Sequence, residues 1–131
     1  MTDSPTSPGG AGAIVPAVLD PVALDKLREL DPDGRRRVVQ RVLTAFESSL
    51  TRWLAQLEVQ RGDSHPATVN HIAHTLKSSA SSVGAKELAQ ACADVERRLR
   101  AGETAELAVD VERLLGLGHS ALAAIRAMLR A

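Results

Sequence analysis

From Asp20 to the end of the chain, apolar side chains recur at helical spacing, and no stretch shows the alternation of a half-buried strand. This period is typical of amphipathic helices, each of which has one apolar face to bury. Leu, Val and Ala supply that face, because the chain has only one Phe and one Trp and no Tyr. The pattern therefore predicts an all-α fold.

Two short sequence signals mark where the first helices begin. Asp20-Pro21 and Asp31-Pro32 each combine a side chain that caps a helix N-terminus with a proline that fits the first turn. They predict a short first helix, and a second helix that starts after Asp31 and reaches about Gln60. The short helix is expected to cap the longer ones.

Proline and glycine also bound the later helices. Pro66 lies in the first turn of a third helix, which Gly84 ends or bends, as a glycine just past a helix end does. A fourth helix closes at Gly102, and a fifth spans about residues 104–129, with a break near Gly116 left open. Long helices joined by short loops favour an up-and-down antiparallel four-helix bundle, with the short N-terminal helix as its cap.

The first 18 residues differ from the rest of the chain in composition. They contain three of the six prolines and three of the nine glycines, and Asp3 is their only charged residue. Such a segment buries too little apolar surface to offset the entropy cost of ordering it. We therefore expect a disordered tail over residues 1–18 and a single helical bundle over residues 19–131.

Charge and hydropathy exclude several classes of function. Sixteen basic and sixteen acidic residues cancel, so no excess positive charge attracts nucleic acid or an anionic membrane. The single cysteine, Cys92, cannot form an internal disulfide or a multi-cysteine zinc site. No apolar run approaches the ~18 residues of a spanning helix, and the N-terminus lacks the features of a signal peptide. The expected location is the cytoplasm, without membrane insertion.

The third predicted helix carries the residues of most chemical interest. Between Asp63 and Glu87 there is no acidic residue, and Lys77 and Lys86 are the only formal charges. At about 100° per residue, His74 and Lys77 lie away from the apolar face, which is formed by Val69, Ile72, Ala73, Leu76, Ala80 and Val83. His74 is thus expected to face solvent beside Lys77, on a surface of small hydroxyl residues.

This arrangement suits a histidine that meets an anion. A neutral imidazole, the dominant form at neutral pH, is a nucleophile that can accept a phosphoryl group. Lys77, three residues after His74, lies over the same surface and can pair with phosphate oxygens. Ser78, four residues after His74, is small enough to leave room for the phosphate and its donor. Because the site lies mid-helix, side chains rather than a helix N-terminus must supply the positive charge.

The same residues resemble a known family, the histidine-containing phosphotransfer (HPt) domain. The family pattern has a histidine, a lysine three residues on, a small hydroxyl-rich stretch and a glycine ten residues on. A leucine, often a cysteine, and a hydrophobic residue followed by Gln or Glu come on the next helix. The matching residues are His74, Lys77, Gly84, Leu88, Cys92, Val95 and Glu96. The resemblance covers about residues 20–130 and is sharpest over residues 71–102.

The resemblance implies a phosphorelay intermediate rather than an enzyme. His74 would accept a phosphoryl group from a receiver-domain aspartate, or from a hybrid histidine kinase, and pass it to another response-regulator receiver. The receiver would bring the Mg²⁺ ion, and the chain would need no cofactor or metal of its own. The residues expected to support the phosphate or the ring are Lys77, Ser78 and Glu96, and those expected to contact the partner are Asn70, His71, Ser81, Leu43 and Leu54.

The chain departs from the family pattern at Ser78, where a glycine is usual. Serine is small and can donate a hydrogen bond to phosphate, so transfer is expected to survive. The added bulk lies where a receiver would pack closely, and the transfer rate and the choice of partner therefore stay open.

Several alternatives stay open from the sequence alone. A helical adaptor that binds receivers or a kinase without carrying phosphate is one, and the phosphoacceptor domain of a chemotaxis-type kinase is another, although no ATP-binding sequence follows in these 131 residues. His71 is a second histidine outside the apolar face, but no lysine follows it three residues on. His71 and His74 also have the spacing of two metal ligands on one helix, but this helix supplies no third ligand. Leu43 and Leu54 fit the core as well as a docking patch, and Glu96 also fits an exposed surface acid.

Overall fold

A computed structural model of the chain describes residues 19–34 and 37–130. Within these residues it contains helices and no strand, which confirms the all-α prediction. The prediction of a disordered tail over residues 1–18 lies outside the described residues. The helices are α2 (Pro21–Glu29), α3 (Val38–Val59), α4 (Pro66–Ser82), α5 (Lys86–Arg100) and α6 (Leu107–Arg130).

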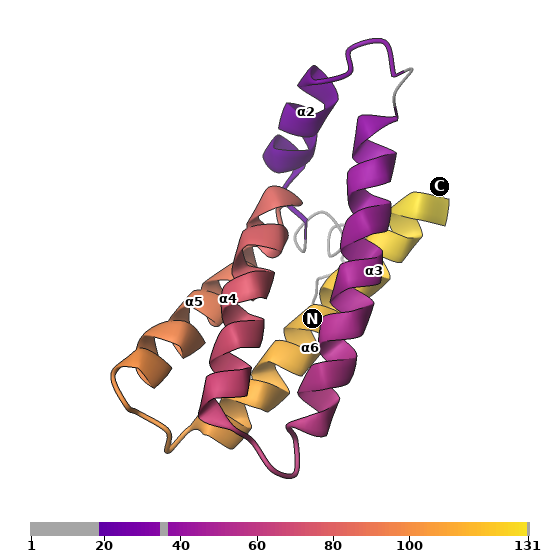
Figure 1. The fold of residues 1–131 in the computed structure, drawn as a ribbon. Coiled ribbons are helices and arrows are strands. Elements are labelled where there is room, and N and C mark those ends of the chain that lie inside the picture. The colour runs from indigo at the N-terminus through magenta and orange to yellow at the C-terminus, as the bar shows by residue number, and fades with distance from the viewer. Residues whose placement is uncertain (1–18, 35–36, 131) are drawn as a thin grey trace, which may run out of the picture.

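The four longer helices enclose one apolar core. Helix α3 packs against α4 and α6, and α5 packs against the same two helices. Figure 1 shows α2 beyond the C-terminal end of α4, where it reaches across toward α3. The side chains at the centre are fully buried and come from every long helix; they include Leu50, Leu57, Ile72, Leu76, Val95, Leu114 and Ile125.

The predicted cap of the first helix is confirmed. The Asp20 carboxylate accepts a hydrogen bond from the Val22 N–H at 3.1 Å, as an N-cap side chain does. The same residue also reaches the turn after α4, because its N–H donates to the Gly84 carbonyl at 2.7 Å and its carboxylate pairs with Lys86 at 2.9 Å. Asp20 therefore both starts α2 and fastens it to the α4–α5 turn.

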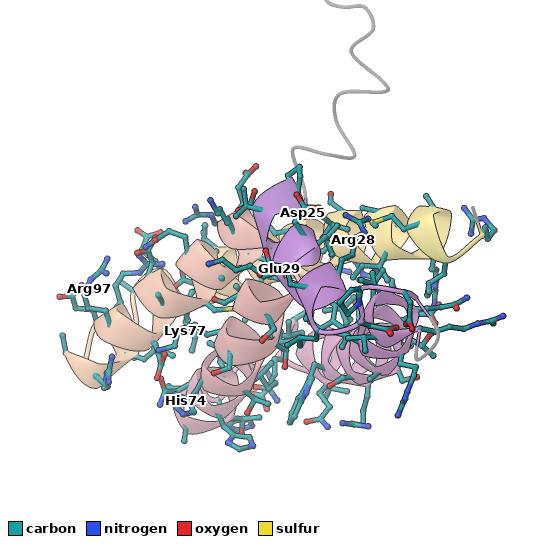
Figure 2. All side chains as sticks on the ribbon, turned by 90° about the horizontal axis from the view of Figure 1, so that it is seen from above. Asp25, Arg28, Glu29, His74, Lys77 and Arg97 are labelled. Carbon is teal, nitrogen blue, oxygen red and sulfur yellow. The ribbon has the colours of Figure 1, made fainter. Side chains whose placement is uncertain are left out.

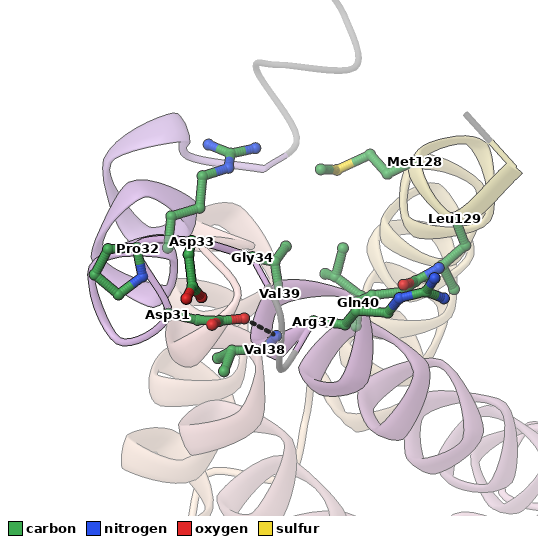
Figure 3. Close-up of a pocket in the computed structure, with 12 residues that line it drawn as sticks. Asp31, Pro32, Asp33, Gly34, Arg37, Val38, Val39, Gln40, Met128 and Leu129 are labelled. Carbon is green, nitrogen blue, oxygen red and sulfur yellow. Dashed lines mark hydrogen bonds between the residues drawn. The ribbon is translucent and has the colours of Figure 1, made fainter.

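The predicted start of the second helix is wrong. Helix α3 begins at Val38, not after Asp31, because the backbone between them leaves the helical region: φ is 71° at Gly34 and 52° at Arg37. Asp31 nevertheless acts on this helix, since its carboxylate accepts a hydrogen bond from the Val38 N–H at 3.3 Å (Figure 3). The capping side chain is correctly identified, but it acts across a loop.

Glycine ends two helices as predicted. Gly84, with φ of 79°, follows α4; its N–H donates to the Ser81 carbonyl, and the Ala85 N–H donates to the Ala80 carbonyl. This pair of hydrogen bonds defines a Schellman motif. Gly102 ends α5 with the same φ of 79°. The turn at residues 83–85 is short, so α4 and α5 lie side by side (Figure 1).

Helix α6 runs without interruption from Leu107 to Arg130, so the break considered at Gly116 does not occur. Its other glycine, Gly118, is buried, and a Cβ atom there would overlap the side chain of Leu54 on α3. The glycine thus lets α3 and α6 approach closely.

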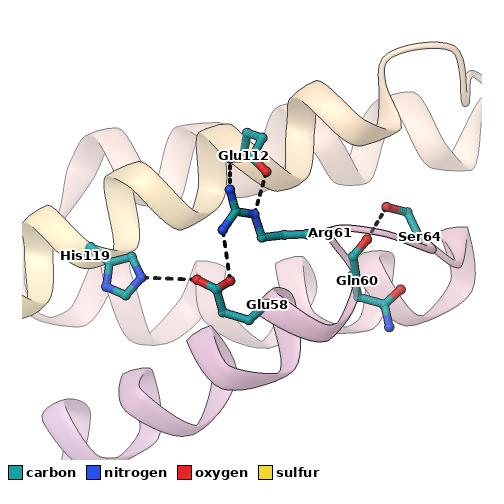
Figure 4. Close-up of polar contacts among 6 residues, drawn as sticks. All are labelled: Glu58, Gln60, Arg61, Ser64, Glu112 and His119. Atoms are coloured by element: carbon teal, nitrogen blue, oxygen red, sulfur yellow. Dashed lines mark hydrogen bonds and ion pairs between the residues drawn. The ribbon is translucent and has the colours of Figure 1, made fainter.

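Polar contacts tie the helix ends together at the surface. The Arg61 guanidinium, just after α3, donates to both carboxylate oxygens of Glu112 on α6 at 2.7 and 3.2 Å, and to Glu58 at 3.2 Å (Figure 4). These side chains are about half exposed, and such surface pairs typically contribute about 0–1 kcal/mol. A more buried pair, Arg98 with Asp110, joins α5 to the start of α6.

Gly84 and Gly102, the glycines that follow α4 and α5, give a matched test of the α4–α5 turn. Gly84→Ala should lower the free energy of unfolding by roughly 2–4 kcal/mol, because alanine is strained at positive φ and its Cβ would lie within 3 Å of the Asp20 backbone. Gly102→Ala should lower it by only about 1–2 kcal/mol, because it has the same φ but open space around the new Cβ. Urea unfolding of both variants measures the difference. Equal losses of unfolding free energy would mean that overlap of the new Cβ with the Asp20 backbone costs nothing.

Candidate functional site

His74 lies in the middle of α4 with its side chain 67% exposed. In Figure 2 the labelled side chains of His74 and Lys77 lie close together at the outer edge of the molecule. The predicted outward orientation of His74 is confirmed, because the opposite face of α4 is the one buried in the core: Val69, Ile72, Ala73, Leu76 and Ala80 are all fully buried.

A buried carboxylate on α5 lies behind this histidine. Glu96 Oε2 is 2.7 Å from His74 Nδ1, and Glu96 Oε1 is 2.7 Å from Lys77 Nζ. The side chain of Glu96 is only 4% exposed, against 34% for Lys77. The expected proximity of Glu96 to the ring is therefore present, whereas the alternative of an exposed surface acid is wrong. One carboxylate holds two side chains that lie almost one helical turn apart.

Helix packing explains how these residues meet. The α4–α5 turn folds α5 back along α4, which brings together positions 22 residues apart in the sequence. Ala91, Cys92 and Val95 occupy the buried face of α5, and Glu96 follows directly after Val95 at the edge of that face. Its carboxylate can therefore be buried and still reach α4.

The surroundings of Glu96 keep it ionised. The hydrogen bond from Lys77 lowers the pKa of Glu96 most strongly and the hydrogen bond from His74 lowers it further, while burial opposes both. The net effect holds the pKa below its usual range, so the group is a carboxylate at neutral pH. A carboxylate accepts hydrogen bonds but cannot donate them. The proton of the neutral His74 ring must therefore lie on Nδ1, which leaves the lone pair on Nε2.

Cys92, on the same helix as Glu96, forms no hydrogen bond or ion pair with His74, Lys77 or Glu96 in the described structure. It is fully buried, and burial, reinforced by the negative charge of Glu96, raises the pKa of its thiol to about 12. A thiol that stays protonated and inaccessible is neither a nucleophile nor a metal ligand. Cys92 is therefore an inert residue of the core.

The exposed residues around His74 differ in their surroundings. Ser78 and Ser81 are exposed on α4, as is His71, whose ring meets Trp53 edge-on with centroids 5.7 Å apart. Asn70 is partly buried, and its Oδ1 atom is buried without a hydrogen-bond partner. These four residues lie on the two sides of α4 that flank His74.

Two of the predicted partner contacts are wrong. Leu43 and Leu54 are 2% and 3% exposed and belong to the core. Leu54 packs against Gly118 of α6, so the close approach of α3 and α6 buries it. Neither side chain offers surface to a partner protein.

An open groove of about 1010 Å³ lies next to the site and was not predicted. It is bordered by α2, the C-terminal half of α4 and the start of α5, and Lys77 and Ser81 contribute to its wall. Sequence spacing gives no signal for it, because it depends on where Asp20 fastens α2. Its other charged or apolar lining residues include Asp20, Val22, Lys26, Leu27, Leu30 and Lys86. A second hollow, of about 540 Å³, lies at the α2–α3 corner and involves neither His74 nor Lys77 (Figure 3).

Metal and membrane properties complete the description of the site. Nowhere in residues 19–34 or 37–130 do three His, Cys, Asp or Glu side chains gather as metal ligands would. In the same part of the chain, no helix has both the length and the apolar character that crossing a membrane requires.

Comparison with known proteins gives two matches. The family model described as "Hpt domain" matches residues 41–131, which is more than half of the chain. The crystal structure of histidine-containing phosphotransfer protein B (HptB) from Pseudomonas aeruginosa PAO1 is similar, with a TM-score of 0.73 and 22% sequence identity, over 86% of this chain and 95% of that one. At this identity the likeness shows a shared fold. No curated protein sequence matches the chain.

The lowered pKa of Glu96 predicts a pH-dependent stability difference. Its contribution is complete above the unfolded pKa, near about 4.3, and is lost as the pH falls through the lower folded value. Glu96→Gln should therefore lower the free energy of unfolding by about 1–3 kcal/mol at neutral pH. The difference from wild type should shrink as the pH falls through the lowered folded pKa, because wild-type Glu96 then becomes neutral as well. Denaturant titrations at neutral pH and at a series of acidic pH values measure it; a difference independent of pH would contradict the ionised state.

Proposed function

Because this chain belongs to the Hpt domain family, whose members carry phosphoryl groups in phosphorelays rather than act as enzymes, we propose that His74 is its phosphoacceptor. It receives the phosphoryl group from a receiver-domain aspartate or a hybrid histidine kinase, and passes it to another receiver aspartate. The observation that carries this proposal is the ring of His74, exposed to a partner on one side and bonded through Nδ1 to the buried Glu96 on the other.

The chemistry follows from the position of the free lone pair. Glu96 accepts the Nδ1 proton, so Nε2 of His74 is the atom that attacks phosphorus. Fixing the ring in this tautomer and orientation lowers the entropy cost of reaching an in-line geometry. The receiver is expected to hold the Mg²⁺ that neutralises the phosphoryl oxygens. This chain supplies the oriented nucleophile and nearby positive charge.

Lys77 and Ser78 border the space that the phosphoryl group would occupy. Lys77 is one-third exposed and bonds Glu96 through a single hydrogen bond, so a small rotation about its flexible stem brings the ammonium toward a phosphate. Ser78 is exposed four residues after His74, on the same surface. We assign Lys77 to charge neutralisation, and Ser78 to the close packing between this helix and the receiver.

The same proposal includes the partner surface and the arrangement of the fold. Asn70, His71 and Ser81 flank His74 on α4 and are the residues we expect a receiver to contact. We infer an up-and-down antiparallel four-helix bundle over residues 19–131, capped by α2; the packing of α3 and α5 each against α4 and α6 supports it. A cytoplasmic location is part of this proposal, because receivers and hybrid kinase output domains operate there.

Replacing the acceptor tests the function directly. His74→Gln should abolish phosphoryl acceptance and change the melting temperature little, because the side chain is mostly exposed and the glutamine amide can donate to Glu96 in place of the Nδ1–H. His71→Gln is the comparison on the same helix: His71 is expected to contact the receiver but not to carry phosphate, so this variant should still be labelled, at a rate that reports the loss of that contact. Acid-labile phosphate after incubation with phosphorylated receivers is the readout. If the wild type binds receivers but takes no label, the alternative function is indicated, that of a helical adaptor that binds receivers without carrying phosphate.

Ser78 tests how closely the receiver approaches α4. Ser78→Leu should slow transfer by at least about tenfold, because a large side chain would separate the two proteins beside the acceptor, a loss of about 1.4 kcal/mol of transition-state stabilisation. Ser78→Ala, which removes the hydroxyl but adds no bulk, should transfer at a rate within a few-fold of wild type. Transfer rates from a phosphorylated receiver measure both variants. Wild-type rates for Ser78→Leu would show that the receiver does not pack on this surface.

A further inference from the structure

The group behind His74 is an ionised carboxylate, which does more than orient a ring. An orienting contact needs only a hydrogen-bond acceptor, and a neutral amide provides one. Glu96 in addition places a negative charge 2.7 Å from Nδ1, and its own side chain is only 4% exposed. Glu96 therefore influences the charge of the ring both before and after phosphorylation.

We propose that Glu96 holds the Nδ1 proton on the phosphorylated ring of His74, so that the ring is a cation while it carries phosphate and leaves as neutral imidazole when phosphate moves on. This inference rests on the proposed function, because it concerns the phosphorylated form of the same residue. It makes Glu96 a positioning residue that also sets the reactivity of the phosphohistidine.

The atoms and charges balance without any proton transfer. On acceptance, the Nε2 lone pair forms the N–P bond, the P–O bond to the receiver aspartate breaks, and its electron pair leaves with that carboxylate. The ring, with its proton still on Nδ1, becomes positive. On donation, the N–P bond breaks, its electron pair returns to Nε2, and His74 is again neutral with the proton on Nδ1. Had Nδ1 lost its proton, the leaving group would be an imidazolate anion, which is a far poorer leaving group.

The geometry favours the cationic ring. A separation of 2.7 Å is typical of a hydrogen bond between a charged donor and a carboxylate. Because Glu96 is 4% exposed, water screens this attraction less than it would at the surface. The carboxylate therefore stabilises the protonated phosphohistidine more than the deprotonated one.

The other charged groups near the ring act against this attraction or lie farther from it. Lys77, on α4 itself, bonds the second oxygen of Glu96 and shares its negative charge. On α5, the exposed Arg97 pairs with Asp94, and Arg100 lies one turn beyond Glu96. On α3, Arg52 lies over the Trp53 ring, which in turn meets the ring of His71 rather than that of His74. Glu96 is the only acid with a hydrogen bond to His74 among the described residues.

The test is a pH titration of the phosphorylated protein by ³¹P NMR. The full chain is phosphorylated with phosphoramidate, and the signal of phosphorylated His74 is assigned by its absence from His74→Gln. The midpoint of the shift of this signal with pH reports loss of the Nδ1 proton. Glu96→Gln should lower this midpoint by about one pH unit or more. Lys77→Ala should raise it, because the carboxylate then no longer shares its charge.

The outcomes separate this inference from the proposed function. Equal midpoints in wild type and Glu96→Gln, with His74 labelled in both, would overturn the inference and leave His74 as the acceptor. Failure of wild-type His74 to take any label would overturn both. If Glu96→Gln does not fold, Glu96→Asp replaces it in the test, because aspartate keeps the negative charge on a shorter side chain. The midpoint of its ³¹P titration should lie between the midpoint of wild type and that expected for a neutral side chain. An Asp variant below that range would count against a role for charge.

Discussion

The hydrogen bonds of the Glu96 carboxylate are the interaction on which the rest of the site depends. Taking an ionised carboxylate out of water is unfavourable unless other groups replace the lost hydration. His74 and Lys77 do so here, one on each oxygen. The consequence is reciprocal: burial of Glu96 is tolerated because two side chains of α4 bond to it, and those side chains are held in place because the carboxylate is buried. The His74 ring is thus held by α5 on its Nδ1 side, and its side chain stays mostly exposed to solvent.

This arrangement requires a fixed register between α4 and α5, which the turn at Gly84 provides. The positive φ of Gly84 allows the two capping hydrogen bonds that end α4, and its carbonyl accepts from the Asp20 N–H. Asp20 also pairs with Lys86 at the start of α5. A single residue therefore connects α2 to the α4–α5 turn and to the first residue of α5, beside the groove that Lys77 helps to line. Helix α2 precedes the segment matched by the family model, so this border of the site comes from outside the matched segment.

The sequence predicts what is local and misses what acts through space. The cap at Asp20, the helix ends at Gly84 and Gly102 and the outward face of His74 follow from neighbouring residues and helical period. The start of α3 does not, because Asp31 caps it across a loop whose left-handed turn at Arg37 has no sequence signature. From the sequence, Leu54 fits the core as well as a docking patch, and it is the packing of α6 that buries it. The position of Glu96 beside His74 came from the family resemblance, since spacing within one helix cannot place a residue on the next.

One side of the His74 ring bonds a buried carboxylate, while the side chain as a whole is mostly exposed. This arrangement suits a carrier that partner proteins must reach from outside. A catalytic cleft would enclose the reacting atom and restrict access to one substrate, whereas a phosphorelay intermediate has to meet a donor and then a recipient at the same nitrogen. Here the Nδ1 proton and the carboxylate that accepts it, which must not change between the two encounters, lie on the side of the ring that faces α5, and the carboxylate is buried. The surface on the other side bears small hydroxyls and no acid between Asp63 and Glu87, so it places little bulk and no negative charge in the path of a phosphoryl group. One fixed ring can in this way serve both directions of transfer.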